Sequence, residues 1–215
     1  MSTVANLKNR VYRLLINPEQ DAYDSELFYD ALGAALDAIL PWFPKTAILT
    51  LAGDGGNTQA LPTDIYITEA CVDDATGEML PKANLIPGYT RGEDIAATND
   101  WLEFPSGSLT FSKAITVGET YTLYYLAHWS KPTSEDDEED TNLETPEFLD
   151  TALVLYATAQ MILPSALSAS EVRQFNTKVD SGNPEHNPMQ QTSKYLLRLF
   201  MDEMSRHPKY QRAQR

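Results

Sequence analysis

Cysteine and histidine are scarce in this chain of 215 residues, which holds one cysteine, Cys71, and three histidines. A single cysteine excludes an internal disulfide bond, because that bond needs two thiols. With only three scattered histidines beside it, a structural zinc site is not expected either. Cys71 lies between Ala70 and Val72 in an apolar stretch. We therefore expect it to be a buried, inert thiol rather than a nucleophile.

Positive charge and long apolar runs are also in short supply. The chain has 16 Lys and Arg against 31 Asp and Glu, which gives a formal charge of −15. This balance argues against sequence-independent binding to nucleic-acid phosphates and against anionic membranes. No apolar run approaches the length of a membrane span, and residues 1–4 lead into a helical pattern without a signal-peptide core. We expect no membrane partner and folding in a cytoplasm.

Two amphipathic helices are predicted at the start of the chain. Apolar residues recur at helical spacing from Val4 to Leu15, Ser2 or Thr3 can cap this helix, and Asn17-Pro18 ends it. A second helix begins at Asp24 or Ser25, and its apolar face consists of Leu27, Ala31, Leu32, Ala35, Leu36, Ile39 and Leu40. It also carries small residues that let another helix approach closely, namely Gly33, Ala34, Ala35 and Ala38.

Residues 45–130 form a β-rich insertion, because β-formers and turn signals replace the helical period. Turns are predicted at residues 53–57 and 73–78, and a long loop at 84–100. The predicted strands are Thr46–Leu51, Asp64–Val72, Trp101–Phe104, Ser108–Phe111 and Tyr121–Trp129.

An acidic linker is predicted at residues 131–144, around six consecutive acids from Glu135 to Asp140. Runs of like charge stay solvated and extended. The alternative is a docking strip for a basic partner.

Helices return after the linker. Thr145-Pro146-Glu147 opens a helix that is predicted to end at Pro164. Ser168 with Glu171 predicts a short helix to about Phe175, and the last helix is predicted over residues 188–207.

The predicted fold class is α+β, a mostly α-helical bundle built from both chain ends with a central β-rich insertion. Residues 1–44 and 145–207 supply the bundle, and residues 208–215 form a basic C-terminal tail. We expect one shared core, in which three residues of the later helix, Phe148, Leu155 and Tyr156, pack against Leu32, Leu36 and Ile39 of the second helix.

Signatures of catalysis are missing from this pattern. No serine stands in a nucleophile-elbow context, and the glycine run at residues 53–56 lacks the Lys-Ser/Thr of a phosphate-binding loop. Asp73-Asp74 does not match an EF-hand loop. We expect no catalytic residue, no bound metal and no cofactor, and interpret the chain as an assembly subunit rather than an enzyme.

Two segments are candidate contact sites. The stretch 173–188 is read as a polar loop between helices, and its candidate contact residues are Arg173, Asn176, Lys178, Asp180, Asn183 and His186. A structured interhelical connection without contacts is the alternative. The basic end of the chain carries Arg206, Lys209, Tyr210, Arg212 and Arg215 and is either a docking tail or a frayed terminus.

This arrangement resembles a phage or prophage head-to-tail connector, also called an adaptor or neck protein. The resemblance covers the whole chain in architecture and depends most on Leu61-Pro62-Thr63-Asp64-Ile65-Tyr66, the Trp101–Gly107 hairpin, the Tyr121–Trp129 strand and the Arg173–Pro188 segment.

The resemblance implies a structural protein of the virion neck, assembled in the host cytoplasm. About twelve neighbouring copies would form a ring beneath the portal protein. The C-terminal tail would enter portal clefts, and the β-insertion would face the next tail or nozzle protein. DNA would pass through the acidic lumen without specific binding.

Two other classes stay open at this point. A tail or baseplate subunit would share the β-rich insertion without needing a docking tail. A hydrolase with an unfamiliar site would need convergent carboxylates, for which Glu69, Asp73 and Glu103 are the candidates within the insertion.

Overall fold

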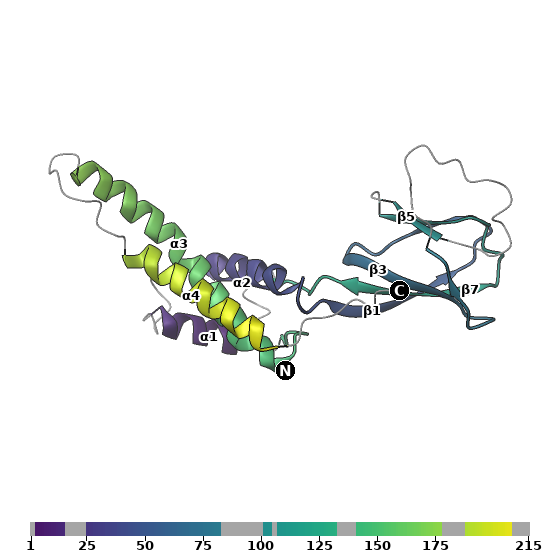
Figure 1. The fold of residues 1–215 in the computed structure, drawn as a ribbon, viewed down its shortest axis with the longest axis horizontal. Coiled ribbons are helices and arrows are strands. Elements are labelled where there is room, and N and C mark those ends of the chain that lie inside the picture. The colour runs from purple at the N-terminus through teal and green to yellow at the C-terminus, as the bar shows by residue number, and fades with distance from the viewer. Residues whose placement is uncertain are drawn as a thin grey trace. The chain divides into compact units, whose positions relative to one another are not determined.

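The chain divides into two compact units (Figure 1). The computed structural model describes residues 3–15, 25–82, 101–104, 107–132, 141–177 and 188–207. One unit combines Met1–Pro44 with Trp129–Arg215, and the other is Lys45–His128. Helices from both chain ends pack together and an antiparallel sheet lies between them in the chain, so the predicted α+β class is confirmed.

The helical unit is organised around its longest helix. Helix α3 (Asp150–Thr177) packs against α1 (Val4–Leu14), α2 (Ser25–Ile39) and α4 (Pro188–Arg206). Of the two predicted caps of α1, the structure uses Thr3, whose Oγ1 accepts a hydrogen bond from the Asn6 amide at 3.2 Å. At the start of α3, Arg10 of α1 pairs with Asp150 at 3.5 Å. None of the helices in the described part of the chain is long and apolar enough to cross a membrane.

All four helices contribute to one apolar core. Its buried members include Leu7 and Val11 of α1, Phe28, Leu32 and Leu36 of α2, Leu153, Ala157 and Met161 of α3, and Phe200 and Met204 of α4. A buried hydrogen bond between Ser193 Oγ and the Ala159 carbonyl, 3.0 Å long, joins α4 to α3. Chain ends that are far apart in sequence thus depend on one another for burial.

The expected role of Phe148 was wrong. Its side chain is 47 % exposed, whereas the next residue, Leu149, is fully buried. A short 3-10 helix, η3 (Glu147–Leu149), precedes α3 and has three residues per turn instead of 3.6. This changes which residue faces the core. Leu155 and Tyr156 are partly buried and pack against it as expected.

The predicted helix end at Pro164 was also wrong, because α3 continues without interruption to Thr177. Ser168 therefore lies inside α3 and does not start a separate helix. An interior proline removes one backbone hydrogen bond and costs about 3 kcal/mol. Packing against α4 holds the residues of α3 in helical geometry and outweighs this local cost.

The predicted acidic linker is packed at both of its described edges. Lys131 forms an ion pair with Asp37 of α2, and Leu143 is buried in the helical core. The Val4 amide donates a hydrogen bond to the Thr141 carbonyl at 3.1 Å. The acidic run at residues 135–140 lies outside the described residues.

The inserted unit contains two antiparallel sheets. The first has the order β1-β7-β3-β4 and consists of β1 (Lys45–Ala52), β7 (Thr120–Ala127), β3 (Ile65–Asp73) and β4 (Met79–Leu80). The second has the order β2-β6-β5 and consists of β2 (Thr58–Ala60), β6 (Ser108–Phe111) and β5 (Trp101–Phe104). The hairpin of β5 and β6 and the three main predicted strands are confirmed.

Apolar residues from both sheets form the core of this unit. Leu51, Cys71 and Leu123 belong to the first sheet, and Trp101, Leu109 and Phe111 to the second. The indole N–H of Trp101 donates to the Leu80 carbonyl at 3.2 Å, so this large side chain is buried without an unmet donor.

Candidate functional site

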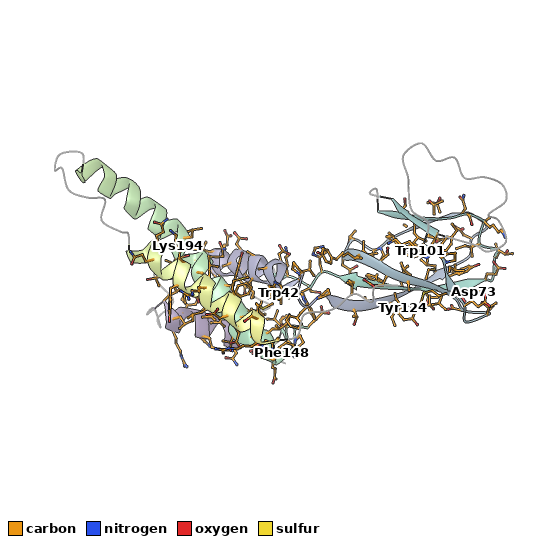
Figure 2. The ribbon with its side chains drawn as sticks, in the orientation of Figure 1. Trp42, Asp73, Trp101, Tyr124, Phe148 and Lys194 are labelled. Atoms are coloured by element: carbon orange, nitrogen blue, oxygen red, sulfur yellow. The ribbon has the colours of Figure 1, made fainter. Side chains whose placement is uncertain are left out.

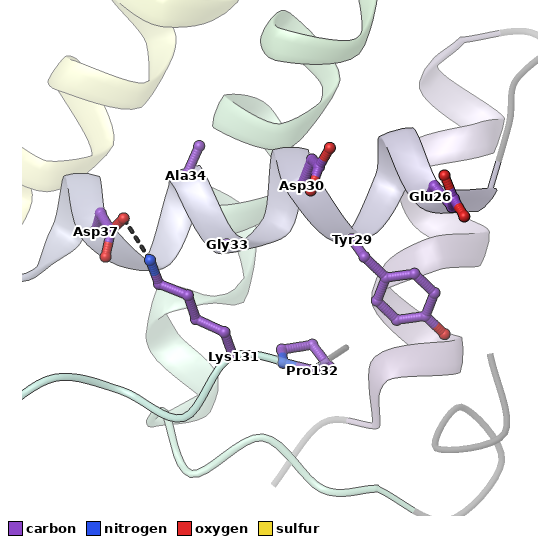
Figure 3. Close-up of a pocket in the computed structure, with 8 residues that line it drawn as sticks. All are labelled: Glu26, Tyr29, Asp30, Gly33, Ala34, Asp37, Lys131 and Pro132. Carbon is purple, nitrogen blue, oxygen red and sulfur yellow. Dashed lines mark hydrogen bonds and ion pairs between the residues drawn. The ribbon is translucent and has the colours of Figure 1, made fainter. Parts of the chain in front are cut away.

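An open groove of about 550 Å³ lies along helix α2 (Figure 3). Its lining includes the acids Glu26, Asp30 and Asp37, the small residues Gly33 and Ala34, and Lys131 of the segment that crosses beneath the helix. Residues 26, 30, 33 and 37 share one side of a helix because their spacing follows its turns. The opposite side of α2 is buried in the core. The groove is therefore the solvent side of an amphipathic helix.

The groove has a mostly negative charge. Lys131 Nζ lies 2.6 Å from Asp37 Oδ2, which satisfies that acid (Figure 3). Asp30 is exposed and forms no hydrogen bond or ion pair with any part of the chain that the structure describes. In the middle of this face Gly33 is buried beneath the Lys131 side chain, whose Cδ lies 3.5 Å from where a Gly33 Cβ would be, and Ala34 adds only a methyl group to the lining. Such a face can accept a second helix that carries cationic side chains.

The outer face of α4 carries cationic and large apolar side chains, in contrast to the acidic groove of α2. Lys194, Tyr195, Arg198 and Met201 are all exposed, the tyrosine by 60 % and the methionine by 50 %. Lys194 is labelled on this helix in Figure 2. The buried side of α4 carries Ser193, Phe200 and Met204. The sequence analysis used only the inward residues of this helix, although the same periodicity identifies the outward ones.

An aromatic cluster fixes the end of α4, where the predicted docking tail begins. The rings of Phe43 and Phe148 lie 5.5 Å apart, and His207 lies 4.8 Å from Phe148 and 6.2 Å from Phe43. The Trp129 indole N–H donates to the Phe43 carbonyl at 2.9 Å. The sequence analysis missed this cluster, because its members are remote in sequence. Each member of the cluster lies next to the end of a helix or strand. This position was the only signal in the sequence that could have identified the cluster.

The candidate tail residues are only partly described. Arg206 is the last residue of α4 and pairs with Glu203 one turn earlier, at 2.7 Å. The remaining candidates lie outside the described residues: Lys209, Tyr210, Arg212 and Arg215. An exposed pair of this kind contributes little to stability, so Arg206 can exchange Glu203 for another acid.

The candidate loop at 173–188 begins later than predicted. Arg173 and Asn176 belong to α3, so the loop interpretation was wrong for them, for the same reason that Pro164 does not end that helix. The last helix begins at Pro188 as predicted. Outside the described residues lie Lys178, Asp180, Asn183 and His186.

The outer face of the four-stranded sheet is uncharged where its three main strands pair. Ile48 of β1 is opposite Tyr124 of β7, which is opposite Ala70 of β3. Ile48 is 63 % exposed and Tyr124 is 43 % exposed. Figure 2 shows Tyr124 and the core residue Trp101 on opposite sides of this sheet. This face offers apolar contact area without charge.

The residues considered for chemistry have structural surroundings. Burial, followed by the nearby Asp74 and Asp73, raises the pKa of Cys71 to about 12, so its thiol stays protonated at neutral pH. Asp73 Oδ1 accepts a hydrogen bond from the Ala75 amide at 2.9 Å and so shapes the turn after β3. Within the described ranges, no three His, Cys, Asp or Glu side chains gather in a way that could hold a metal ion.

No protein-family model matches the chain, and neither does any curated protein.

Proposed function

We propose that this chain is a structural subunit of a bacteriophage neck, an adaptor that joins the portal vertex of the capsid to the tail in a ring of copies. The observation that carries this proposal is the shared helical core. Helices from both chain ends bury one another, and the β-unit is inserted between α2 and α3. This is the layout that the resemblance to head-to-tail connectors implies.

The aromatic cluster at the end of α4 supports the role of the tail. His207 packs on Phe43 and Phe148, so the chain leaves the helical unit at a defined point. The eight residues that follow contain Lys209, Arg212 and Arg215 and no acid. A cationic segment anchored at one end is suited to acidic clefts on a portal protein. The net charge of −15 also suits a channel through which DNA slides without adhering.

Removal of residues 208–215 tests this proposal. The truncated chain is expected to lose binding to a co-expressed portal protein and to keep its circular dichroism spectrum, because the helical core ends before Pro208. The double substitution Lys209→Glu and Arg212→Glu should weaken binding more than Lys209→Gln and Arg212→Gln. Added salt should weaken the wild type, because charge attraction is screened within about 8 Å at physiological ionic strength. A truncated chain that binds with unchanged affinity would contradict the tail's role.

A tail or baseplate subunit is the second candidate, and the uncharged outer sheet face favours it. Ile48 and Tyr124 could pack against a flat apolar surface of a neighbouring tail protein. This candidate predicts binding to tail proteins and no binding to portal protein, so the same co-expression experiment separates the two.

A further inference from the structure

We propose that the outer face of α4 in one copy packs against the α2 groove of a neighbouring copy, with the two helices parallel. This interface rests on the proposed ring of copies and identifies the two surfaces that join them. It gives the exposed outer face of α4 and the open groove along α2 one occupant, a second copy of this chain.

The α4 face has the composition of a contact surface rather than of a solvated helix side. Tyr195 and Met201 expose 60 % and 50 % of their surface, and Lys194 and Arg198 lie beside them. In the described part of the chain, neither Lys194 nor Arg198 has an ion-pair partner. Aromatic, methionine and arginine side chains together are enriched at protein interfaces.

The two faces have matching spacing. Lys194, Arg198, Met201 and Ser205 follow the pattern i, i+4, i+7 and i+11 along α4. The α2 groove repeats this pattern with Glu26, Asp30, Gly33 and Asp37. In a parallel pair with these patterns in register, each of the two cations therefore lies opposite an acid.

The same register assigns a level to three further side chains of α4. Met201 lies at the level of Gly33, which is buried beneath the Lys131 side chain, with Lys131 Cδ 3.5 Å from where a Cβ on Gly33 would be. The methionine would therefore pack against the aliphatic stem of Lys131. Asp202 is an exposed acid of α4 and lies at the level of Ala34, three residues before Asp37. The exposed hydroxyl of Ser205 comes opposite Asp37.

The directions of the helices are compatible with a ring. Both α2 and α4 pack on α3 and run in the direction opposite to it (Figure 1). A rotation about an axis along the helices leaves their direction unchanged, so α4 of one copy stays parallel to α2 of the next. Because the two faces differ, the contact is heterologous, and repeated heterologous contacts close into a ring when the rotation closes.

The contact is expected to be weak in the isolated protein. A single helix pair buries much less than the roughly 1,600 Å² of a standard stable interface. Its charge pairs lie at the surface and weaken with salt. Stable rings would therefore need additional contacts on a portal.

Disulfide trapping tests the interface directly. The native Cys71 is buried and does not compete, so new cysteines report on their own surroundings. Full-length Ala34→Cys and Met201→Cys proteins, distinguished by tag size, are mixed at low salt and oxidised. We expect the mixed dimer in several-fold excess over the dimer that either variant forms alone. The control mixes Met201→Cys with Ile48→Cys, because Ile48 is 63 % exposed, more accessible than the partly buried Ala34, but lies on the sheet. A mixed dimer no more abundant than this control would overturn the interface.

Charge reversal supplies the second measurement. Arg198→Glu in the Met201→Cys protein should lower the yield of mixed dimer, and Asp30→Lys in the Ala34→Cys partner should restore it. Arg13→Glu changes the net charge equally at an exposed site on α1 and should leave the yield unchanged. Equal losses for Arg13→Glu and Arg198→Glu would show a general charge effect and overturn the specific pairing.

The outcomes separate this interface from the proposed function. A portal-bound ring in which residues 34 and 201 do not cross-link would overturn the interface and leave the adaptor role standing. Cross-linking in a protein that binds no portal would support the interface and contradict the adaptor role.

Discussion

Leu36 shows at the scale of one residue how the two chain ends depend on each other. It is 1 % exposed in the core that α1, α2, α3 and α4 share. Leu36→Ala is expected to lower the free energy of unfolding by roughly 2–5 kcal/mol, since it leaves a cavity that neighbouring side chains fill only in part. Urea denaturation followed by circular dichroism measures this change. Leu14→Ala on α1 is the matched control, because Leu14 is 49 % exposed and should have little effect.

The fold strongly changes the acid–base chemistry of Cys71. Its pKa rises from an ordinary 9.0 to about 12, mainly through burial. Alkylation by iodoacetamide at neutral pH is expected to be slow in the native protein and fast in urea, as mass spectrometry would measure. Rapid alkylation of the native protein would contradict the burial of this side chain.

The raised pKa of Cys71 also makes the stability of the folded protein depend on pH in a defined direction. The folded state holds the thiol proton more tightly than the unfolded state does. The contribution of the protonated Cys71 thiol to the free energy of unfolding is therefore fully present below about pH 9. It is lost as the pH rises towards 12. Cys71→Ser would remove this contribution.

Helix α3 is the element in which local and tertiary preferences disagree. It runs through Pro164, which lacks the amide that would bond to the Gln160 carbonyl. Pro164→Ala restores this donor and is expected to raise the melting temperature, with a gain of at most about 3 kcal/mol in the free energy of unfolding. Differential scanning calorimetry would measure the change.

Pro146 provides the control for this substitution. It stands before η3 with a φ of −61°, a value that proline adopts without strain. Pro146→Ala should therefore give no gain in stability. A lower melting temperature for Pro164→Ala would mean that this proline is needed where it stands.

The association of copies into a ring depends on the surface and charge of the whole molecule. The purified protein is expected to be monomeric or weakly associated and to form a ring when portal protein is present, because a single helix pair buries little area and the surplus charge of every copy is negative. Mass photometry with and without portal would distinguish these states. A stable large ring of the isolated protein at micromolar concentration would contradict assembly on a partner.

The candidate surfaces were harder to predict from the sequence than the fold was. The small residues Gly33 and Ala34 predicted close approach by another helix, whereas the side chain that lies over Gly33 is that of Lys131. Lys131, which forms the side of this groove, was assigned to a linker, because an ion pair with Asp37 across 94 residues leaves no trace in local pattern.

The sequence by itself determined where apolar faces occur and therefore the class of the fold. Helical period at both ends and β-formers in the middle specify helices around an inserted sheet unit, since burial of each apolar face requires another. The tertiary structure alone decided that α3 passes through Pro164, that Leu149 rather than Phe148 faces the core, and that Phe43, Phe148 and His207 meet. These outcomes depend on packing between segments remote in the chain, and such packing outweighs local preferences of a few kcal/mol.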